Sequence, residues 1–363
     1  MSYHVEVIST LEGLDNLKSR WQELCAQLPE NTGFFSTYSY LRLYLEFHQP
    51  SHWIVAAIYN GDQSELLGIF PLSFFNIKSE GTLYRACKPL STTYAAYFDF
   101  AVVSHQRRQV LAMLNLVLTE HLKCDVALLG PLHESSPLFT VLLQDMSRDQ
   151  LKIIGNPDSL SEIETRGQSF DAYFRRKKSL TLPAARYEER RLRRMGEVDI
   201  RVGDHSDELA AIVLELCGRN EEQFSEINYY RQHPEWKDYL AMLACQLVPQ
   251  GLAEVSTLRF NGRVIASALC FLQPGRRSLY LAAYDQKFAR HSPSKVLLAH
   301  MLKQSFDEKS VFCFGTGDYQ YKRDWSQSLG ETRIPVIYFN DKARQGLDKD
   351  LVLAKLGRYL RLH

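Results

Sequence analysis

The residues whose types and spacing best suit chemistry lie around position 290. The chain reads Arg290-His291-Ser292-Pro293-Ser294-Lys295, and the apolar spacing that follows predicts a helix over residues 293–306. The first N–H groups and the positive dipole end of a helix attract anions. Ser292, Ser294, Arg290 and Lys295 can add charge-assisted hydrogen bonds. The segment therefore indicates an anion site that includes His291, or a plain helix start capped by Ser292.

A second cluster of basic residues lies between residues 175 and 194. It holds nine basic residues against two acidic ones: Arg175, Arg176, Lys177, Lys178, Arg186, Arg190, Arg191, Arg193 and Arg194, with Glu188 and Glu189. Such a run fits contact with a sugar phosphate, a lipid-linked phosphate, an anionic membrane face or tRNA, and equally a solvated helix face. Arg175 and Lys178 are our candidates for binding an anionic substrate. Pro183 should break or kink this helical stretch because it lacks an N–H group.

The motifs of several common enzyme classes are absent from the sequence. There is no H-E-x-x-H, no G-x-S-x-G, no G-x-x-x-x-G-K-[ST] and no dinucleotide-type G-x-G-x-x-G. This disfavours a metalloprotease, a serine hydrolase, a P-loop NTPase and a Rossmann dehydrogenase. The seven cysteines form no C-x-x-C pair and lie mostly in apolar contexts, which is typical of reduced, buried thiols. No metal site is predicted.

The composition is that of an ordinary globular protein with two or three domains in 363 residues. Lys and Arg number 43 and Asp and Glu 42, so the formal charge of +1 disfavours a globally basic nucleic-acid binder. No apolar run is long enough to span a bilayer, and the N-terminus does not have the pattern of a secretory signal. We therefore expect a cytoplasmic protein.

The elements that must position these residues occur twice, in the same order. Hairpin dipeptides at Asn60-Gly61 and Asn261-Gly262 lie about 200 residues apart. Each hairpin is preceded by one strand and two helices, and is followed by a β-rich segment, a helix, an apolar strand, a helical segment and a last strand. Both halves thus read β-α-α-β-β-β-α-β-α-β, which predicts a duplicated α/β domain with a mixed sheet.

We expect an N-terminal domain over residues 1–160 and a C-terminal domain over residues 165–340. The polar, turn-rich residues 155–168 between them are typical of a linker. The last part, residues 341–363, should form a C-terminal helix over about residues 342–360.

Four blocks of the second half carry a family resemblance. They are FDAYFRRKKSLTLPAARYEERRLRRMG (170–196), LRFNGRVIASAL (258–269), YLAAYDQKFARHSPSKVLLAHML (280–302) and FGTGDYQYKRDW (314–325). They resemble the GNAT acyltransferases, and among these the CelD-like proteins associated with cellulose and exopolysaccharide biosynthesis. That family is similar to the FemAB-type tandem GNAT proteins, which transfer amino acids from aminoacyl-tRNA. The resemblance implies two GNAT-like domains, each a mixed twisted sheet flanked by helices.

The resemblance also implies a co-substrate, acetyl-CoA or another acyl-CoA, in the second domain. Its amide-rich arm would pair with the edge of a strand over residues 278–284 that diverges from its neighbour. Its pyrophosphate would lie at the helix start formed by Arg290, His291, Ser292, Ser294 and Lys295. The family's phosphate loop usually contains glycines, whereas this segment has none and Pro293 removes one donor. The matching residues 104–111 of the first half also lack glycine and favour a structural role there.

The resemblance points to Tyr321 as the general acid, with Tyr319 as second choice. Asp285 follows the donor strand and could activate or orient a nucleophile, or be a turn residue. Asp318 and Lys322 follow Gly315-Thr316-Gly317 and are candidates for binding the substrate. Alternatively, the tyrosines are packing residues and Lys322 is a solvated charge.

The preferred function is an acyl-CoA-dependent N- or O-acyltransferase that acts on a small or sugar-linked acceptor in a cleft between the domains. One alternative is a FemAB-like transferase that uses aminoacyl-tRNA or another carrier. No long helical insertion of the kind found in FemAB-type proteins is visible, which disfavours tRNA. The other alternative is a GNAT-like binding protein without activity.

Overall fold

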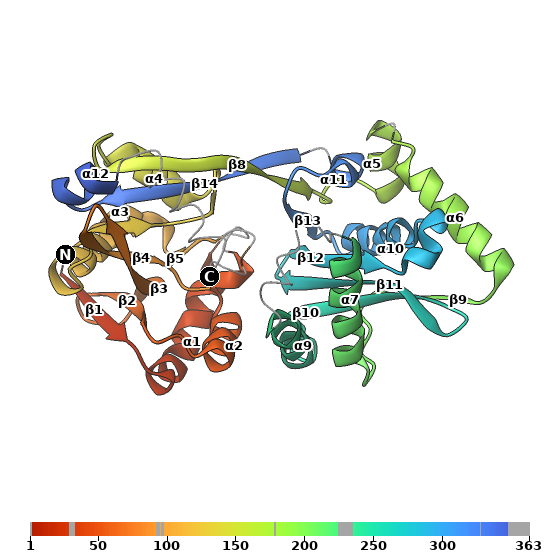
Figure 1. Ribbon diagram of the computed structural model, residues 1–363, viewed down its shortest axis with the longest axis horizontal. Helices are drawn as coiled ribbons and strands as arrows, with labels where there is room; N and C mark the ends of the chain where they lie inside the picture. The colour runs from red at the N-terminus through yellow and green to blue at the C-terminus, as the bar shows by residue number, and fades with distance from the viewer. Residues whose placement is uncertain are drawn as a thin grey trace. The chain divides into compact units, whose positions relative to one another are not determined.

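The computed structural model describes residues 2–28, 33–91, 95, 98–177, 179–223, 235–326 and 328–347. The chain divides into two compact units, each with its own core cluster (Figure 1). Unit 1 comprises Met1–Ser159 and Gly330–His363, and unit 2 comprises Leu160–Leu329. Among the described residues, every helix is too short or too polar to cross a bilayer.

Unit 1 is a mixed sheet with helices packed on it. Its strands follow the order β1-β2-β3-β4-β6-β14, with β5 paired to β3 and β7 paired to β14. The elements are β1 (Tyr3–Ile8), α1 (Leu11–Gln27), α2 (Tyr38–His48), β2 (Trp53–Asn60), β3 (Leu66–Ser79), β4 (Thr82–Pro89), β5 (Ala101–Val102), η3 (Ser104–Gln106), α3 (Arg107–Leu116), η4 (Val117–His121), β6 (Val126–Leu128), β7 (Leu132–His133), α4 (Pro137–Asp145), β8 (Leu151–Ile163), β14 (Ser328–Tyr338) and α12 (Asp341–Leu347).

Unit 2 repeats the plan around a sheet of order β8-β13-β12-β11-β10-β9, to which β8 contributes its last residues. Its elements are α5 (Phe170–Lys177), α6 (Thr181–Met195), β9 (Val198–Arg201), α7 (Leu209–Gln223), α9 (Glu235–Leu247), β10 (Ala253–Phe260), β11 (Arg263–Gln273), β12 (Arg276–Tyr284), η5 (Gln286–His291), α10 (Pro293–Asp307), β13 (Val311–Thr316) and α11 (Gln320–Trp325). The predicted order of elements is confirmed in both halves.

The two predicted hairpins differ in their turns. Asn261 and Gly262 both have positive φ, 48° and 80°, as a two-residue turn between β10 and β11 requires. The first hairpin instead has a longer connection, because β2 ends at Asn60 and β3 begins at Leu66. Only the second Asn-Gly pair therefore forms the tight turn that the dipeptide predicts.

The segment predicted as a linker is largely strand. β8 runs from Leu151 to Ile163, and its end pairs with β13 through Ile163↔Phe312 and Glu162↔Cys313. On the C-terminal side, β14 pairs with β6 through Val336↔Leu128, so residues 330–340 group with unit 1 rather than with the second half. Of the predicted C-terminal helix, α12 covers Asp341–Leu347, and the remainder lies outside the described residues.

The basic stretch forms two helices, as the proline predicts. α5 ends at Lys177 and α6 begins at Thr181, which places Pro183 in the first turn of α6. A proline is tolerated there because the first N–H groups of a helix have no partner within the helix.

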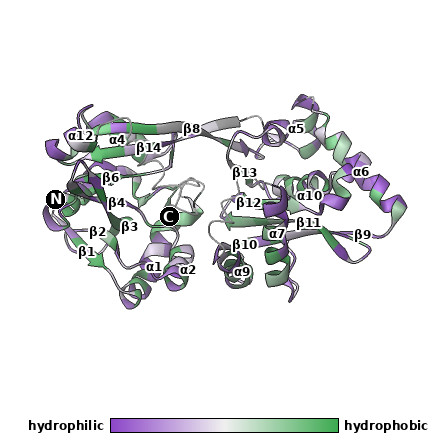
Figure 2. Cartoon of the chain, viewed as in Figure 1, coloured by the Kyte–Doolittle hydropathy of each residue, from purple (hydrophilic) through white to green (hydrophobic). Residues whose placement is uncertain are grey.

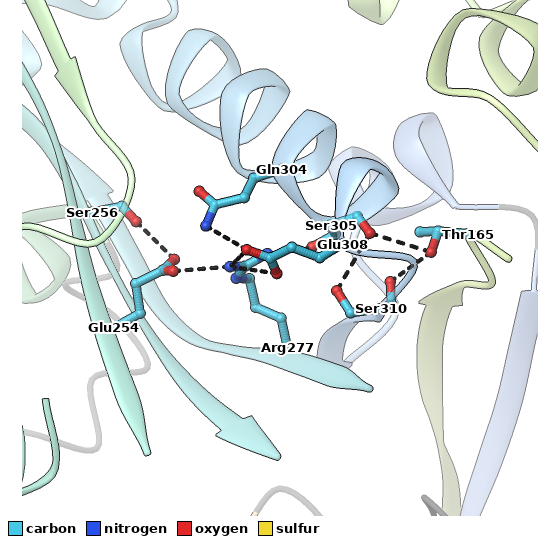
Figure 3. A network of polar contacts seen from close by, with 8 residues as sticks. All are labelled: Thr165, Glu254, Ser256, Arg277, Gln304, Ser305, Glu308 and Ser310. Atoms are coloured by element: carbon cyan, nitrogen blue, oxygen red, sulfur yellow. Dashed lines mark hydrogen bonds and ion pairs between the residues drawn. The ribbon is translucent and has the colours of Figure 1, made fainter. Parts of the chain in front are cut away.

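A buried polar network crosses the core of unit 2 (Figure 3). Arg277 on β12, only 3% exposed, donates hydrogen bonds to Glu254 on β10 at 2.9 Å and to the Ser305 hydroxyl on α10 at 2.7 Å. Glu308 lies 3.2 Å from the same guanidinium. Buried charges must be paired in this way, because an isolated one has a large desolvation cost. The network joins two strands to the C-terminal end of α10.

Candidate active site

The sheet of unit 2 opens between its central parallel strands. β12 and β13 are in register only at Arg276↔Val311, Arg277↔Phe312 and Ser278↔Cys313, although β12 continues to Tyr284. On its other edge β12 stays paired with β11 as far as Tyr284↔Ala266. In the part of the chain that the structure describes, residues 279–284 thus present an edge that β13 does not pair. This confirms the diverging strand expected over residues 278–284.

A glycine makes this divergence possible. Gly315 has φ of +73°, and the register between β13 and β8 is irregular between Cys313 and Thr316. A positive φ bends the strand at a bulge, and glycine adopts it without steric cost. The bend begins two residues beyond Cys313, the last residue of β13 that pairs with β12.

Asp285 directly follows β12, and both of its carboxylate oxygens accept hydrogen bonds. Its Oδ1 accepts a hydrogen bond from the Lys287 N–H at 3.0 Å, and its Oδ2 accepts one from Arg263 at 2.7 Å. The residue is 8% exposed and starts the short helix η5. The sequence allowed Asp285 to activate or orient a nucleophile, or to be a turn residue. These contacts support the turn residue.

The start of α10 combines helix N–H groups with unused side chains. Ser292 occupies the N-cap position with φ of +44°, yet its side chain makes no capping bond. The Ser294 hydroxyl oxygen is buried without a hydrogen-bond partner among the described residues. Lys295 is half-buried and has no carboxylate partner within the same described part of the chain. A free hydroxyl and a free cation at the N-terminus of a 15-residue helix suit an anionic group.

His291, expected to bind the donor, is buried between Arg290 and Glu188. It is 1% exposed, and its Nδ1 lies 3.2 Å from the Glu188 carboxylate on α6. Its Nε2 accepts a hydrogen bond from the Arg290 Nε–H at 3.0 Å. With Nε2 as the acceptor, Nδ1 is the ring nitrogen that can donate to Glu188. His291 therefore holds the Arg290 side chain by a hydrogen bond, and Glu188 holds His291 in turn. Sequence reasoning did not identify Glu188.

The second group of candidates follows β13. The Tyr319 and Tyr321 rings stack with centroids 6.1 Å apart, and the side chains are 51% and 36% exposed. Surrounding protein atoms raise the pKa of Tyr321, and the neighbouring Tyr319 raises this pKa further. Tyr321 therefore keeps its proton at neutral pH, and its raised pKa makes the phenol a weaker proton donor than an ordinary tyrosine.

Lys322 and Asp318 have partners within the same turn. The Lys322 ammonium is buried and donates hydrogen bonds to the carbonyl oxygens of Gly315, at 3.2 Å, and Thr316. Asp318 forms an ion pair with Arg323. The first contact holds the bend at the end of β13, so Lys322 is neither the solvated charge nor a free cation.

Side chains from α5 and the residues after it hold α11 in place. The Lys177 ammonium donates to the Arg323 carbonyl at 2.8 Å and also to that of Ser326. The Tyr173 hydroxyl donates to the Trp325 carbonyl and the Ser179 hydroxyl to the Asp324 carbonyl, both at 3.0 Å. The last carbonyls of a helix otherwise lack partners. Nothing in the basic run distinguished Lys177 from its neighbours.

The remaining substrate candidates lie on or next to α5. Arg175 is exposed and forms no ion pair with any described residue, while Lys178 lies outside the described residues. No group of three or more side chains able to bind a metal occurs in the described part of the chain. The site therefore consists of two groups, one at the end of β12 and one at the end of β13.

A family model for an acetyltransferase (GNAT) domain matches residues 182–323, from the start of α6 to α11. This range includes both groups. The match covers less than half of the chain and indicates a GNAT domain over residues 182–323. A search of curated protein sequences finds no match.

Solved structures share the fold of the whole chain. The crystal structure of FemX has a TM-score of 0.60 at 13% identity, over 92% of this chain and 97% of that one. L-PGS from Bacillus licheniformis has a TM-score of 0.53 at 11% identity, over 94% and 97%. A tandem GNAT protein from the clavulanic acid biosynthesis pathway has a TM-score of 0.50 at 11% identity, over 93% and 99%. The tandem GNAT fold expected from the sequence is confirmed.

Proposed function

We propose that the chain transfers an acyl group from an acyl-CoA, such as acetyl-CoA, to an amine or hydroxyl of a small or sugar-linked acceptor. The observation that supports this most is the continuous edge of β12 over residues 279–284, which leads through η5 into the start of α10. Unpaired main-chain groups on such an edge can bind the amides of a pantetheine arm. The helix start then faces the pyrophosphate.

The residues of the chain hold the donor and supply a proton. A bound acyl-CoA would supply the activated acyl group, so no protein nucleophile is needed. Arg290, Ser294 and Lys295 would contact its phosphates, with Arg290 held by His291 and Glu188. The Tyr321 hydroxyl would protonate the departing thiolate.

The lack of glycine at the helix start changes how the phosphates would be held. A glycine-rich loop binds phosphate mainly through main-chain N–H groups, whereas here Pro293 supplies none. Side chains must therefore contribute a larger share of the binding free energy. Substitutions at Ser294 and Lys295 should accordingly weaken donor binding strongly.

Calorimetric titration with acetyl-CoA and longer acyl-CoAs tests the proposal. We expect saturable binding to the wild type, and about tenfold to hundredfold weaker binding to the variant with Ser294→Ala and Lys295→Glu. The matched control is Arg108→Glu, which reverses a charge near the start of α3, where the side chain is 61% exposed. If the wild type binds none of the acyl-CoAs, the proposal is wrong. If both variants lose binding affinity equally, the site assignment is wrong.

A second candidate is transfer from a carrier such as aminoacyl-tRNA, as in the FemAB-type proteins that the chain resembles. The glycine-free helix start and the fold shared with FemX favour it. Tight tRNA binding that falls steeply with salt would support this donor. An acceptor from a polysaccharide pathway is proposed on the CelD-like resemblance alone.

A further inference from the structure

The outward side of α6 has an unusual composition. The helix buries Thr181, Leu182, Ala185 and Leu192. At about 100° per residue, the opposite side carries a different set, which we call the outward face. The outward face consists of Leu180, just before the helix, with Pro183, Tyr187, Arg190, Arg191 and Arg194. Figure 2 shows the helix with hydrophobic and strongly hydrophilic bands along its length.

No carboxylate belongs to the outward face, because the two acidic residues of α6 are turned toward η5 and α10. Glu188 pairs with His291 at 3.2 Å, and Glu189 pairs with His300 at 3.0 Å. Arg190 and Arg194 are exposed and form no ion pair with any residue that the structure describes. A solvated helix face normally mixes charges of both signs. On this face Arg190 and Arg194 present positive charge that no described carboxylate balances.

The outward face also exposes apolar side chains beside these arginines. Leu180 is 81% exposed and Tyr187 is 54% exposed. The Arg191 guanidinium lies 5.8 Å from the centre of the Tyr187 ring and pairs with Glu188 at 2.9 Å, so it covers the ring rather than remaining free. A partner for this face must therefore offer negative charge together with an apolar layer.

We propose that the outward face of α6 docks on the surface of an anionic lipid bilayer. Leu180, Pro183 and the Tyr187 ring would enter the boundary between headgroups and acyl chains, while Arg190 and Arg194 would contact the phosphates. RNA offers phosphates and bases that could stack on a tyrosine, but it offers no apolar layer for leucine and proline. The lipid surface therefore matches more of the face. The proposal does not depend on which acyl donor the chain uses.

Cosedimentation of the full chain with vesicles tests this. We expect strong binding to phosphatidylcholine vesicles that contain one third phosphatidylglycerol and little binding to phosphatidylcholine alone. Arg190→Glu with Arg194→Glu should lower the partition coefficient by about thirtyfold or more, since each basic residue near such a surface contributes about a factor of five. The control, Arg148→Glu with Lys309→Glu, makes the same change in net charge at exposed positions elsewhere and should stay within about twofold of the wild type.

A second pair of variants tests the apolar part of the face. Leu180→Ser with Tyr187→Ser should lower the partition coefficient by about tenfold at unchanged net charge, because both side chains would lose a buried environment. Circular dichroism of each variant checks that the fold is retained. The proposal is overturned if the wild type does not prefer phosphatidylglycerol vesicles, or if both charge-reversal variants lose binding equally. RNA binding that is lost on reversal of Arg190 and Arg194, without vesicle binding, would also overturn it.

Discussion

The two units share one order of elements but differ at their central strands. In unit 2, β12 is continuous along β11 and its last residues face the opening toward β13. In unit 1, β4 ends at Pro89, and the two-residue strand β5 takes the next place on the same edge of β3, opposite Gly68 and Ile69. An extended ligand needs a continuous strand edge to pair with. The two units therefore share the order of elements, while among the described residues this edge and the helix start after it belong to unit 2.

Each unit also buries a carboxylate, and the two carboxylates differ in their partners. Glu254 in unit 2 is paired with Arg277 at 2.9 Å. Asp99 in unit 1 is 7% exposed, accepts a hydrogen bond from the Phe100 N–H at 2.8 Å and is also bound by the Ser136 hydroxyl. Burial raises the pKa of Asp99 to about 6. Unit 2 thus stabilises the Glu254 carboxylate with a cation, whereas burial in unit 1 favours the protonated form of Asp99.

The largest effect should come from breaking the pair in unit 2. Arg277→Met leaves Glu254 buried without its cation, which should lower the free energy of unfolding by about 3–5 kcal/mol. Urea denaturation measures this. Adding Glu254→Leu should restore most of the loss, because two apolar residues replace the whole pair. A single variant as stable as the wild type would contradict the role given to this pair.

A pH-dependent effect should distinguish unit 1. Because the pKa of Asp99 is raised from 3.8 to about 6, the folded state binds its proton more tightly than the unfolded state does. The stability from this group is thus present below about pH 4 and lost as the pH rises through about 6, a change of about 3 kcal/mol. In Asp99→Asn this part should vanish, so the stability difference from the wild type should vary with pH by that amount. A constant difference between pH 4 and pH 7 would contradict the prediction.

The third effect concerns catalysis and the tyrosines next to α11. The helix that follows β6, α4, contains no tyrosine, whereas Tyr319 and Tyr321 flank the start of α11. Tyr321→Phe should lower kcat by about a hundredfold, because it removes the proposed proton donor. Tyr319→Phe should lower kcat only a few fold. The reverse ranking would make Tyr319, the second choice, the general acid.

The smallest effect should come from the bend in β13. Gly315→Ala forces a side chain to adopt φ of +73°, with its Cβ 3.3 Å from the Leu279 carbonyl oxygen. We expect a loss of about 1–2 kcal/mol in the free energy of unfolding, together with weaker acyl-CoA binding. Gly218→Ala in α7 is the control, because its Cβ meets no atom within 4 Å and it should be neutral or stabilising. Equal behaviour of the two variants would show that the bend does not need glycine.

Local patterns in the sequence predicted much of this fold. The repeat of ten elements, the start of α10 at Pro293 and the tight turn at Asn261-Gly262 follow from periodicity and from the fixed backbone preferences of proline and glycine. The strand through residues 155–163 was missed, because its Gly, Asn and Pro residues favour turns and its pairing to β13 is a tertiary contact.

The site could be predicted only in part, for a related reason. Its residues could be found by motif, but their roles depend on partners distant in the sequence. His291 supports Arg290 because Glu188 on another helix meets it, and Lys322 binds carbonyls because β13 bends at Gly315. Neither partner is visible from the spacing around the residue itself. The sequence shows that Gly315 precedes Lys322, but not that the bend at Gly315 brings carbonyl oxygens to the lysine.

The route of β8 limits how this duplicated protein can be divided. A fragment that starts at residue 165 would lack the strand that borders β13, and a fragment that stops there would lack β14 beside β6. Each excised half would expose main-chain groups of an interior strand and become prone to pairing with other chains. The last strand of each half thus pairs with a strand of the other half of the sequence: β8 borders β13, and β14 borders β6. We therefore expect a shorter version to need these strands rejoined in a new order.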